Sequence, residues 1–369
     1  MAGLFDPVQV GSLAFSSRIA MAPMTRSRAG ADGLPSASAP LYYAQRASAG
    51  LVITEGAQVS ETARGYLFTP GIHSEAQVAA WRGVTDAVHA AGGVIFLQLW
   101  HCGRVSHPFF HDGELPGGPS ALPVEGITFT DEGPQPVPTP RAFNLGEIAG
   151  LVDQFAQAAS AAKRAGFDGV ELHGANGYLL DQFLRDGSNR RGDAYGGSAE
   201  NRARLPLEIV EAVTAEWAPE RVSYRISPHF GMYSMSDSDP AATFSHLAGA
   251  LSGKVGLLHV VEPVSGPARV AGPDRMLSHL RRLFGGAVIA NGGYDRALAQ
   301  AAIASGEADL VSFGMSFIAN PDLPARLAEG HPLAEPIEAT IYGGSDEGYI
   351  DYPAIAGRVS NGGASVSGT

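Results

Sequence analysis

Short apolar runs recur along the whole chain, and each is followed by a polar or glycine-containing turn and then by an amphipathic stretch. Runs of this length, apolar on both faces, are typical of buried parallel strands. We predict strands at residues 18–22, 51–55, 94–99, 169–173, 222–227, 256–261, 287–290 and 309–313. The amphipathic stretches predict helices near residues 36–49, 75–91, 145–165, 199–216, 240–252, 274–284, 294–305 and 321–329. Eight such units predict an α/β fold, a single (β/α)8 TIM barrel.

The alternative architecture is an open, doubly wound sheet. Such a sheet usually carries a Gly-x-Gly-x-x-Gly turn after an early strand, and this chain has none. Residues 8–15 alternate around a Gly-Ser turn and predict a small N-terminal hairpin that plugs one end of the barrel. Residues 104–143, rich in Pro and Gly, predict a long irregular insertion after the third strand that acts as a lid or binding loop.

We expect residues 1–355 to form one domain and the Ser-Gly-rich residues 356–369 to be a disordered tail. The composition, 45% apolar and 17% charged over 369 residues, is ample for a large core. No apolar run approaches the length of a membrane span, and the first residues lack a basic region followed by an apolar one. We therefore expect an unexported, cytoplasmic protein.

Charge and cysteine content exclude several classes of function. The net charge is -12 and the basic residues are scattered, which argues against a nucleic-acid or anionic-membrane surface. The single cysteine, Cys102, excludes a disulfide within the chain and any all-cysteine metal site within it. Redox chemistry in this protein would therefore need another cofactor.

His173, Asn176 and Tyr178 follow directly on the predicted strand 169–173. In parallel α/β folds the carboxyl ends of the strands form the ligand-binding face, so an imidazole, a carboxamide and a phenol would meet in one pocket. Such groups suit the binding and protonation of a carbonyl compound. Alternatively, His173 and Asn176 cap the next helix and Tyr178 belongs to the core.

Further polar side chains are predicted at the same end of the barrel. Thr25 follows the first strand, and alternation puts Gln98 and Trp100 on one face of the third. On the fifth strand, alternation points Arg225 into the barrel, where a guanidinium is costly without an anion or several acceptors. It would either pair with Glu171 or face a bound, electron-rich ring.

Glycine-rich turns follow the last two predicted strands, with Gly292 and Gly293 after one and Gly314 after the other. This is where the fold commonly binds phosphate, because backbone N–H groups can approach the oxygens. Alternatively, these glycines only form tight turns. No carboxylate and histidine cluster has the spacing of a metal site, so the combination favours a flat, phosphorylated cofactor and no metal.

Longer motifs extend from residue 4 to about residue 352. They are LFDPVQVG at 4–11, APMTRSRA at 22–29, TEGAQVS at 54–60, QLWHCGRVSHP at 98–108, AGFDGVELHGANGYLLDQFLRDGSNRRGDAYGGSAENRARL at 165–205, RISP at 225–228, FIANPDLPARL at 317–327 and GYIDYP at 348–353. On these motifs the chain resembles the Old Yellow Enzyme family, the FMN-dependent ene reductases. Thr25 and the His173/Asn176 pair resemble the family's original branch, since the thermophilic-like branch usually has Cys in place of Thr25.

The resemblance implies a role for each matching residue. The residues that would bind non-covalent FMN are Pro23, Met24, Thr25, Gly56, Gln98, Arg225, Gly292, Gly293, Gly314 and Met315. Substrate would contact Thr25, Tyr66, Trp100, His173, Asn176, Phe230 and Tyr349, with a loose match at Phe230. His173 and Asn176 would donate to the substrate carbonyl oxygen, and Tyr178 would protonate the α carbon.

The implied reaction is a ping-pong reduction of activated alkenes, namely enones, enals and nitro compounds, with NADPH preferred over NADH and a monomer or homodimer as the active form. Departures from the family pattern are Met315, where an Arg commonly flanks the phosphate, and Cys102, which we interpret as a small buried apolar residue. Met315 predicts weaker flavin retention unless another Arg compensates.

Other functions on the same scaffold stay open or are disfavoured. A redox-neutral or biosynthetic isomerase would use the same three residues. A further alternative is a flavin-free phosphate-binding barrel, an aldolase or isomerase. Its Schiff-base version is disfavoured because the two lysines, Lys163 and Lys254, lie off the predicted strand ends. A non-catalytic binding protein would not need His173, Asn176 and Tyr178 together.

Overall fold

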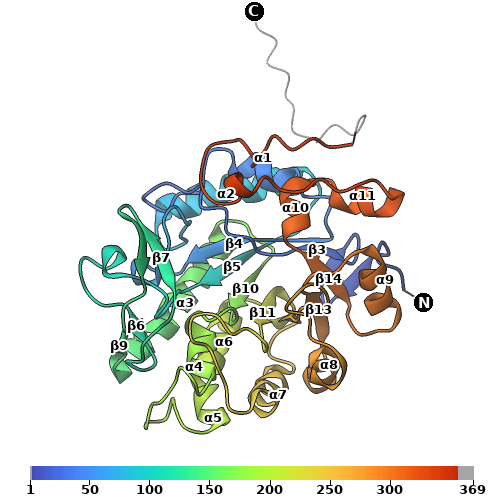
Figure 1. Ribbon diagram of the computed structural model, residues 1–369. Helices are drawn as coiled ribbons and strands as arrows, with labels where there is room; N and C mark the ends of the chain where they lie inside the picture. Colours follow the sequence, from blue (N-terminus) through green and yellow to red (C-terminus); the bar gives the residue numbers. More distant parts are fainter. Residues whose placement is uncertain (1, 356–369) are drawn as a thin grey trace, which may run out of the picture.

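The computed structural model describes residues 2–355, in which eight parallel strands close into a barrel surrounded by helices (Figure 1). The barrel strands are β3 (Ile19–Met21), β4 (Leu51–Gln58), β5 (Ile95–Trp100), β10 (Gly169–His173), β11 (Val222–Ile226), β12 (Leu257–Val261), β13 (Ala287–Asn291) and β14 (Leu310–Phe313). Each strand pairs with the next one along the chain, and β14 pairs with β3 to close the barrel. The (β/α)8 prediction is confirmed. The predicted tail, 356–369, lies outside the described residues.

Helices follow the barrel strands and cover their outer faces. They are α1 (Ala39–Ala44), α2 (Glu75–Ala90), α3 (Leu145–Arg164), α4 (Leu179–Leu184), α5 (Ala199–Arg202), α6 (Arg204–Glu216), α7 (Pro240–Leu251), α8 (Leu277–Phe284), α9 (Arg296–Ala304), α10 (Met315–Ala319) and α11 (Leu323–Glu329). Short 3-10 turns lie at η1 (Glu61–Ala63), η2 (Pro108–Phe110), η3 (Pro219–Arg221), η4 (Gly272–Asp274) and η5 (Glu338–Thr340). None of the helices within residues 2–355 has the length and apolar character needed to cross a membrane.

Two helix predictions need correction, and two short helices were not predicted. α1 ends at Ala44 and not near residue 49, because the backbone continues in tight i→i+3 turns such as Ala47 N–H to Ala44 O. The predicted helix 199–216 is divided at Ala203 into α5 and α6. The short helices α4 and α10 were missed, since each is too short to show a clear period.

A hairpin closes the amino-terminal end of the barrel, as predicted. β1 (Val8–Val10) pairs with the antiparallel β2 (Leu13–Phe15). Val10, Leu13 and Phe15 are buried in one cluster with inward-facing strand residues. The strand members of that cluster are Ala20, Leu51, Ile53, Phe96, Leu257, Ile289 and Leu310. This end of the barrel interior is therefore apolar.

The insertion 104–143 is more regular than its composition predicts. It contains η2, a short pair formed by β6 (Gly117–Gly118) and β9 (Arg141–Ala142), and an antiparallel hairpin of β7 (Ile127–Thr130) and β8 (Gly133–Pro136). Prolines at every second position of β8 concealed the strand, because they are tolerated where the N–H faces away from the partner strand. The buried Thr128 hydroxyl donates to Gly65 O (2.8 Å) and fastens this hairpin to the chain after β4.

Candidate active site

A buried polar layer lies inside the barrel, centred on Glu171 of β10. Its carboxylate accepts hydrogen bonds from Gln98 Nε2 (2.9 Å) and Ser223 Oγ (2.9 Å), and it contacts His259 Nδ1 at 2.8 Å. Burial alone would raise the pKa of Glu171, but His259, Arg225 and the Ser223 hydroxyl hold that pKa at about 2. Burial lowers the pKa of His259, so a neutral imidazole donates to a charged carboxylate.

Arg225 points into the barrel as predicted, and it is 8% exposed. It does not contact Glu171 directly: its Nη2 reaches Asn291 Oδ1 (3.3 Å), and its Nε has no hydrogen-bond partner within the described residues. Of the two interpretations of Arg225, direct pairing with Glu171 is therefore wrong. Its guanidinium keeps a free donor at the carboxyl end of the barrel.

A cavity of about 250 Å³ lies beside Arg225, between the ends of β13, β14 and β3. Its lining includes Met24, Gly293, Gly314 and Met315. A side chain at Gly314 would meet Met24 Sδ at 2.7 Å, and one at Gly293 would meet Ser265 Oγ at 2.4 Å. Gly293 also has a φ of 78°, which favours glycine, whereas Met24 could move aside for a side chain at Gly314. Without side chains, both turns allow a ligand to approach their backbone closely.

A second cavity, of about 540 Å³, lies beside Tyr178 and is mostly apolar. The predicted residues Thr25, Tyr66, Trp100 and Tyr178 line it. The Tyr66 ring stacks on Trp100 (5.5 Å between ring centroids), and Tyr178 meets Trp100 edge to face (4.9 Å). Its further lining residues are Ser27, Leu67, Phe68, Phe129, Tyr233, Tyr342 and Gly343.

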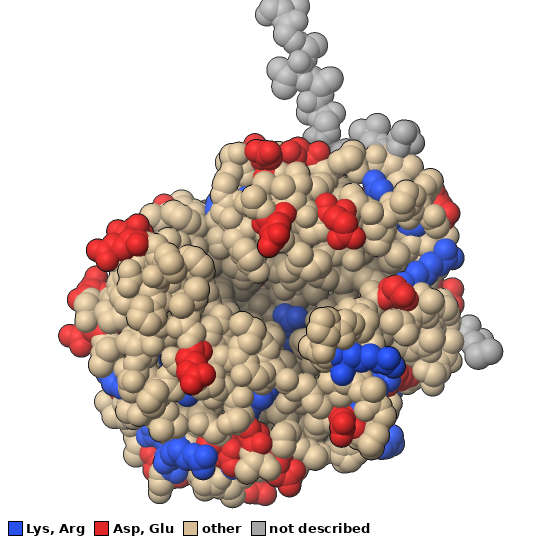
Figure 2. Space-filling model, viewed as in Figure 1, with Lys and Arg blue, Asp and Glu red and all other residues tan. Residues whose placement is uncertain are grey.

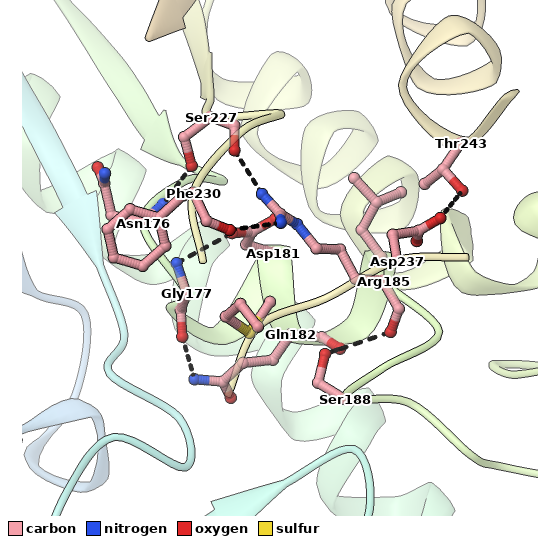
Figure 3. A network of polar contacts seen from close by, with 12 residues as sticks. Asn176, Gly177, Asp181, Gln182, Arg185, Ser188, Ser227, Phe230, Asp237 and Thr243 are labelled. Atoms are coloured by element: carbon pink, nitrogen blue, oxygen red, sulfur yellow. Dashed lines mark hydrogen bonds and ion pairs between the residues drawn. The ribbon is translucent and has the colours of Figure 1, made fainter. Parts of the chain in front are cut away.

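The loop from His173 to Tyr178 is held by polar contacts from the first turn of α4 (Figure 3). Asp181 accepts the Gly177 N–H (2.9 Å), and Gln182 Nε2 donates to Gly177 O (2.8 Å). The N–H and C=O groups of Gly177 are thus both fixed. These contacts hold a turn in which Asn176 and Gly177 have positive φ values of 58° and 78°. The helix-capping interpretation of His173 and Asn176 is wrong, because the N-cap of α4 is Tyr178 and no side chain caps it.

The same network ties this loop to the segment after β11. Arg185 donates through Nε to Asp181 Oδ1 (2.8 Å) and through Nη1 to Phe230 O (2.8 Å). Ser227 Oγ in turn accepts the Asn176 N–H (2.7 Å). Figure 3 shows the Asn176 carboxamide directed away from the Asp181–Arg185 pair, and it meets no partner within residues 2–355.

Burial tunes the two titratable groups of this loop. It lowers the pKa of His173 to about 3, so the imidazole is neutral, and its Nδ1 has no partner among the described residues. Burial raises the pKa of Tyr178 well above its ordinary value of 10, so the phenol stays protonated at neutral pH. The centroids of the His173 and Tyr178 rings lie 5.1 Å apart, so a hydrogen-bond donor, the imidazole, lies next to a possible acid, the phenol.

Four predicted substrate residues are absent from the lining of the larger cavity, namely His173, Asn176, Phe230 and Tyr349. His173 and Asn176 lie beside it, on the segment that leads to Tyr178. Tyr349 is 1% exposed and stacks on Tyr42 (4.1 Å) beneath the guanidinium groups of Arg26 and Arg28, so its assignment to the pocket is wrong. Phe230 is not among the lining residues of this cavity, but its ring lies close to the site loop, where a side chain at Gly177 would meet its Cε1 at 3.2 Å.

Pro23, Gly292 and Gly56 complete the predicted cofactor residues. Pro23 is buried and lines neither cavity. Gly292 has a φ of 131°, and a side chain there would meet Glu262 O at 2.3 Å. A side chain at Gly56 would meet the Trp100 ring at 2.6 Å, so only glycine lets this ring lie against β4.

Sequence reasoning missed several lining residues. Tyr233 follows β11 and Tyr342 follows α11, and both lie in irregular segments without a period. Phe129 comes from the insertion. The signal for Tyr233 was its place after a barrel strand, where side chains of this fold gather around the ligand. Cys102, in contrast, is buried as expected, and burial raises its thiol pKa.

A model of the NADH:flavin oxidoreductase / NADH oxidase family matches residues 3–334. The chain belongs to this family. It is 43% identical over 365 residues to putative 12-oxophytodienoate reductase 4 of Oryza sativa subsp. japonica, over 95% of this chain and 93% of the relative. The similarity between this flavin oxidoreductase and that relative therefore extends over nearly the whole chain.

Two solved structures carry the same fold as this flavin oxidoreductase. Morphinone reductase in complex with tetrahydroNAD is 48% identical with a TM-score of 0.92, and 97% of this chain and 99% of that one are covered. The Old Yellow Enzyme homologue from Zymomonas mobilis is 43% identical with a TM-score of 0.93, and 96% of this chain and 100% of that one are covered. The resemblance to Old Yellow Enzymes is confirmed, and the chain is an FMN-dependent oxidoreductase.

The residues at the barrel mouth fit this cofactor. Arg225 Nε, His173 Nδ1 and Trp100 Nε1 are buried without partners inside the described chain, as expected where a polar, planar ligand completes the site. Figure 2 shows a hollow near the centre of this face with basic atoms on its floor. Within residues 2–355, no three His, Cys, Asp or Glu side chains gather as a metal site requires.

Proposed function

We propose that the protein is an ene reductase that reduces the C=C bond of α,β-unsaturated carbonyl or nitro compounds, with NADPH preferred over NADH. The observation that supports this most is the protonated Tyr178 phenol, which lines an apolar pocket of about 540 Å³ beside Trp100 and Thr25. A pocket of this size and polarity suits a small activated alkene.

His173 and Asn176 are the proposed donors to the carbonyl oxygen of the alkene. The neutral imidazole carries an N–H that no other residue needs, and the Asn176 carboxamide is free to donate. Two donors at this oxygen stabilise the enolate-like charge that develops when the β carbon receives a hydride. Positive φ at Asn176 is maintained by Ser227 and by the contacts of Gly177, so the backbone that carries the carboxamide is fixed before substrate arrives.

Tyr178 is the proposed acid that protonates the α carbon. Its phenol is neutral because burial opposes the tyrosinate, and it therefore carries the proton at neutral pH. Bound FMN supplies the redox chemistry, since it can take a hydride from NAD(P)H and give one to an alkene. Thr25, Gly56, Gln98 and Arg225 would hold its ring, as a fixed cation near the ring favours the reduced form.

The phosphate end of the cofactor would lie in the smaller cavity. Backbone N–H groups of Gly293 and Gly314 would bind its oxygens, with Gly292 shaping the turn. Met24 and Met315 line the same cavity and would contact this end of the cofactor through apolar atoms.

An absorption spectrum of the purified protein tests the proposal directly. We expect flavin bands that bleach on anaerobic addition of NADPH, more slowly with NADH, and that return with 2-cyclohexenone. The product should be two hydrogens heavier than the enone. A product of unchanged mass would indicate an isomerase and contradict the proposed reduction. A colourless protein that takes up no added FMN would contradict the cofactor assignment.

Replacement of Tyr178 by Phe tests the acid. We expect Tyr178→Phe to retain FMN and its reduction by NADPH but to slow alkene reduction by about 10²-fold or more, which is typical for loss of a positioned acid. Stopped-flow measurement of each half-reaction separates the two steps. Unchanged alkene reduction with every activated alkene would exclude Tyr178 as the proton donor.

A further inference from the structure

Three tyrosine hydroxyls form a continuous chain at the pocket. Tyr66 Oη lies 3.1 Å from Tyr178 Oη and 3.1 Å from Tyr233 Oη. A phenol is both a donor and an acceptor, so each of these contacts can run in either direction. The three residues come from the segment after β4, the loop before α4 and the segment after β11, so tertiary folding alone brings them together.

Proton donation leaves Tyr178 in an unfavourable state. Burial raises the pKa of both Tyr178 and Tyr66 well above the usual value, which means that a tyrosinate is costly at either place. A substrate in the pocket that Tyr178 lines would shield the phenol from water on that side. A chain of hydroxyls that leads away from the pocket would then let Tyr178 regain a proton before the product leaves.

The position of Tyr233 is specified by the surrounding chain. Tyr233 and Ser234 have φ values of 56° and 54°, which cost free energy for residues other than glycine. Arg104 donates from Nη2 to Tyr233 O (2.8 Å). A side chain at Gly126 would meet the Tyr233 ring at 2.8 Å, so the insertion packs closely on this ring. Strain of this kind persists where neighbouring structure holds it, often at functional sites.

We propose that Tyr66 and Tyr233 form a proton relay that reprotonates Tyr178 from solvent, an inference that rests on the proposed role of Tyr178 as the acid. The O–H bond of Tyr178 breaks as a C–H bond forms at the α carbon. Tyr66 then gives its proton to the Tyr178 oxygen, Tyr233 gives its proton to Tyr66, and solvent water or a buffer acid gives one to Tyr233. One proton enters the chain for each one consumed, and no electrons move.

All three tyrosines are half-buried, and Tyr233 is assigned the outer position of the relay because of the segment that carries it. Within the described residues its hydroxyl contacts Tyr66, and it lies on a surface segment beside the exposed Met232. Tyr66 and Tyr233 act through Tyr178 and are not assigned contact with the reacting carbon. A purely structural role is the competing explanation, because the Tyr66 hydroxyl also orients a ring that stacks on Trp100.

The test uses the holoenzyme and its Tyr233→Phe variant, which keeps the ring and removes the outer hydroxyl. We follow the half-reaction of the NADPH-reduced enzyme with 2-cyclohexenone by stopped flow, in H₂O and in D₂O mixtures. We expect turnover about tenfold slower, less than loss of the acid itself would cause, because solvent can still reach Tyr66 inefficiently. Tyrosinate absorbance should accumulate in the variant, and added buffer acid should restore the rate.

Three comparisons make the result specific. The wild type should show a curved dependence of rate on D₂O fraction, since several protons move together, and Tyr233→Phe a straighter one. Tyr66→Phe combined with Tyr233→Phe should be no slower than Tyr66→Phe alone, because the two act in series. Tyr342→Phe, a phenol of the same pocket outside the hydroxyl chain, should show the solvent isotope behaviour of the wild type whatever its effect on rate.

The outcomes separate the relay from the proposed function. If Tyr233→Phe leaves the rate and isotope behaviour unchanged, or slows the reaction without accumulation of tyrosinate and without rescue by buffer acid, the relay is wrong. In that case slow alkene reduction by Tyr178→Phe would still support Tyr178 as the acid. If Tyr178→Phe reduces every alkene at the normal rate, the proposed function of Tyr178 fails, and the relay fails with it.

Discussion

The amino-terminal end of the barrel interior is apolar and the carboxyl-terminal end is polar, although the two layers lie only two residues apart along a strand. On four strands, an apolar residue in the amino-terminal layer is followed two positions later, on the same face, by a polar one in the carboxyl-terminal layer. The pairs are Phe96 and Gln98, Leu257 and His259, Ile289 and Asn291, and Leu310 and Ser312. Each of these four strands thus places an apolar side chain in the core at one end and a polar side chain at the candidate site at the other.

The amino-terminal layer is closed by the β1–β2 hairpin and contains only apolar side chains in its buried cluster. The carboxyl-terminal layer instead contains a charged carboxylate, a neutral imidazole and a guanidinium, and some of its donors lack partners among residues 2–355. Buried polar atoms without partners are costly, so they indicate where a ligand belongs.

Removal of the charge at the centre of the polar layer should have the largest effect. Glu171→Leu leaves Gln98 Nε2, Ser223 Oγ and His259 Nδ1 without their acceptor. We expect a loss of about 4 kcal/mol in the free energy of unfolding, typical for breaking a buried charged network. Urea denaturation measures it, with the exposed Glu211→Leu of α6 as control. A stability equal to wild type would mean that the layer is not a coupled network.

Acid should lower the free energy of unfolding through the buried histidines near the polar end of the barrel. Burial lowers the pKa of both His101 and His173 to about 3, so below pH 6.5 the unfolded chain gains protons that the folded chain does not, and stability falls as pH falls. Glu55 acts in the opposite direction between pH 4.5 and 7, because burial raises its pKa to about 7. The net loss should be about 1 kcal/mol per pH unit between 6.5 and 4.5.

The acid effect can be assigned by His101→Asn, which cannot titrate but can still accept the Gly103 N–H. Denaturation of this variant at pH 7, 6 and 5 should show a clearly smaller slope than that of the wild type. An unchanged slope would place the acid sensitivity outside His101.

In the apolar layer, deletion of one methyl group should have a smaller effect. Ile289 is fully buried beside Leu257 and Leu310 in the same cluster. Ile289→Val should lower the free energy of unfolding by about 1 kcal/mol through the lost contacts and the small cavity. Retained FMN affinity would show that the two layers are energetically separate, whereas release of FMN would show that they are coupled.

The smallest expected effect concerns Met315, at the edge of the phosphate cavity. Its side chain is 46% exposed, so an Arg there would approach the phosphate while remaining largely in water. We expect Met315→Arg to tighten FMN binding by about fivefold, in line with the modest strength of exposed ion pairs. Fluorescence titration of the apoprotein measures the dissociation constant. No tightening would mean that the backbone cradle alone determines retention.

The barrel was predictable because each strand is a short apolar run bounded by turns, and parallel strands of this kind leave few alternatives. Alternation also predicted the inward direction of Arg225 and Gln98, since it needs only the strand and its period. The cluster of His173, Asn176 and Tyr178 lies within one loop, so its proximity followed from the chain itself. The roles of these residues stay predictions, as does the lid function of the insertion.

The sequence did not predict what depends on long-range packing. Tyr233 and Tyr342 reach the pocket from irregular segments, whereas Tyr349, in the expected motif, packs against Tyr42. Of the two alternatives for Arg225, pairing with Glu171 was wrong, because Gln98, Ser223 and His259 from three other strands contact this carboxylate. Motifs identify which segments approach the site, but they do not decide which ring of a segment enters it.

Cys102 is a natural probe for transient opening of the structure. It is the one thiol in 369 residues, and it lies just beyond β5 beneath Gly65, where an added side chain would meet its Sγ at 2.9 Å. Alkylating reagents need both access and a thiolate, and burial denies the native state both. The rate at which the intact protein is alkylated therefore reports how often Cys102 is uncovered, whether by local opening or by unfolding of the chain. Such openings can thus be timed without introducing any label.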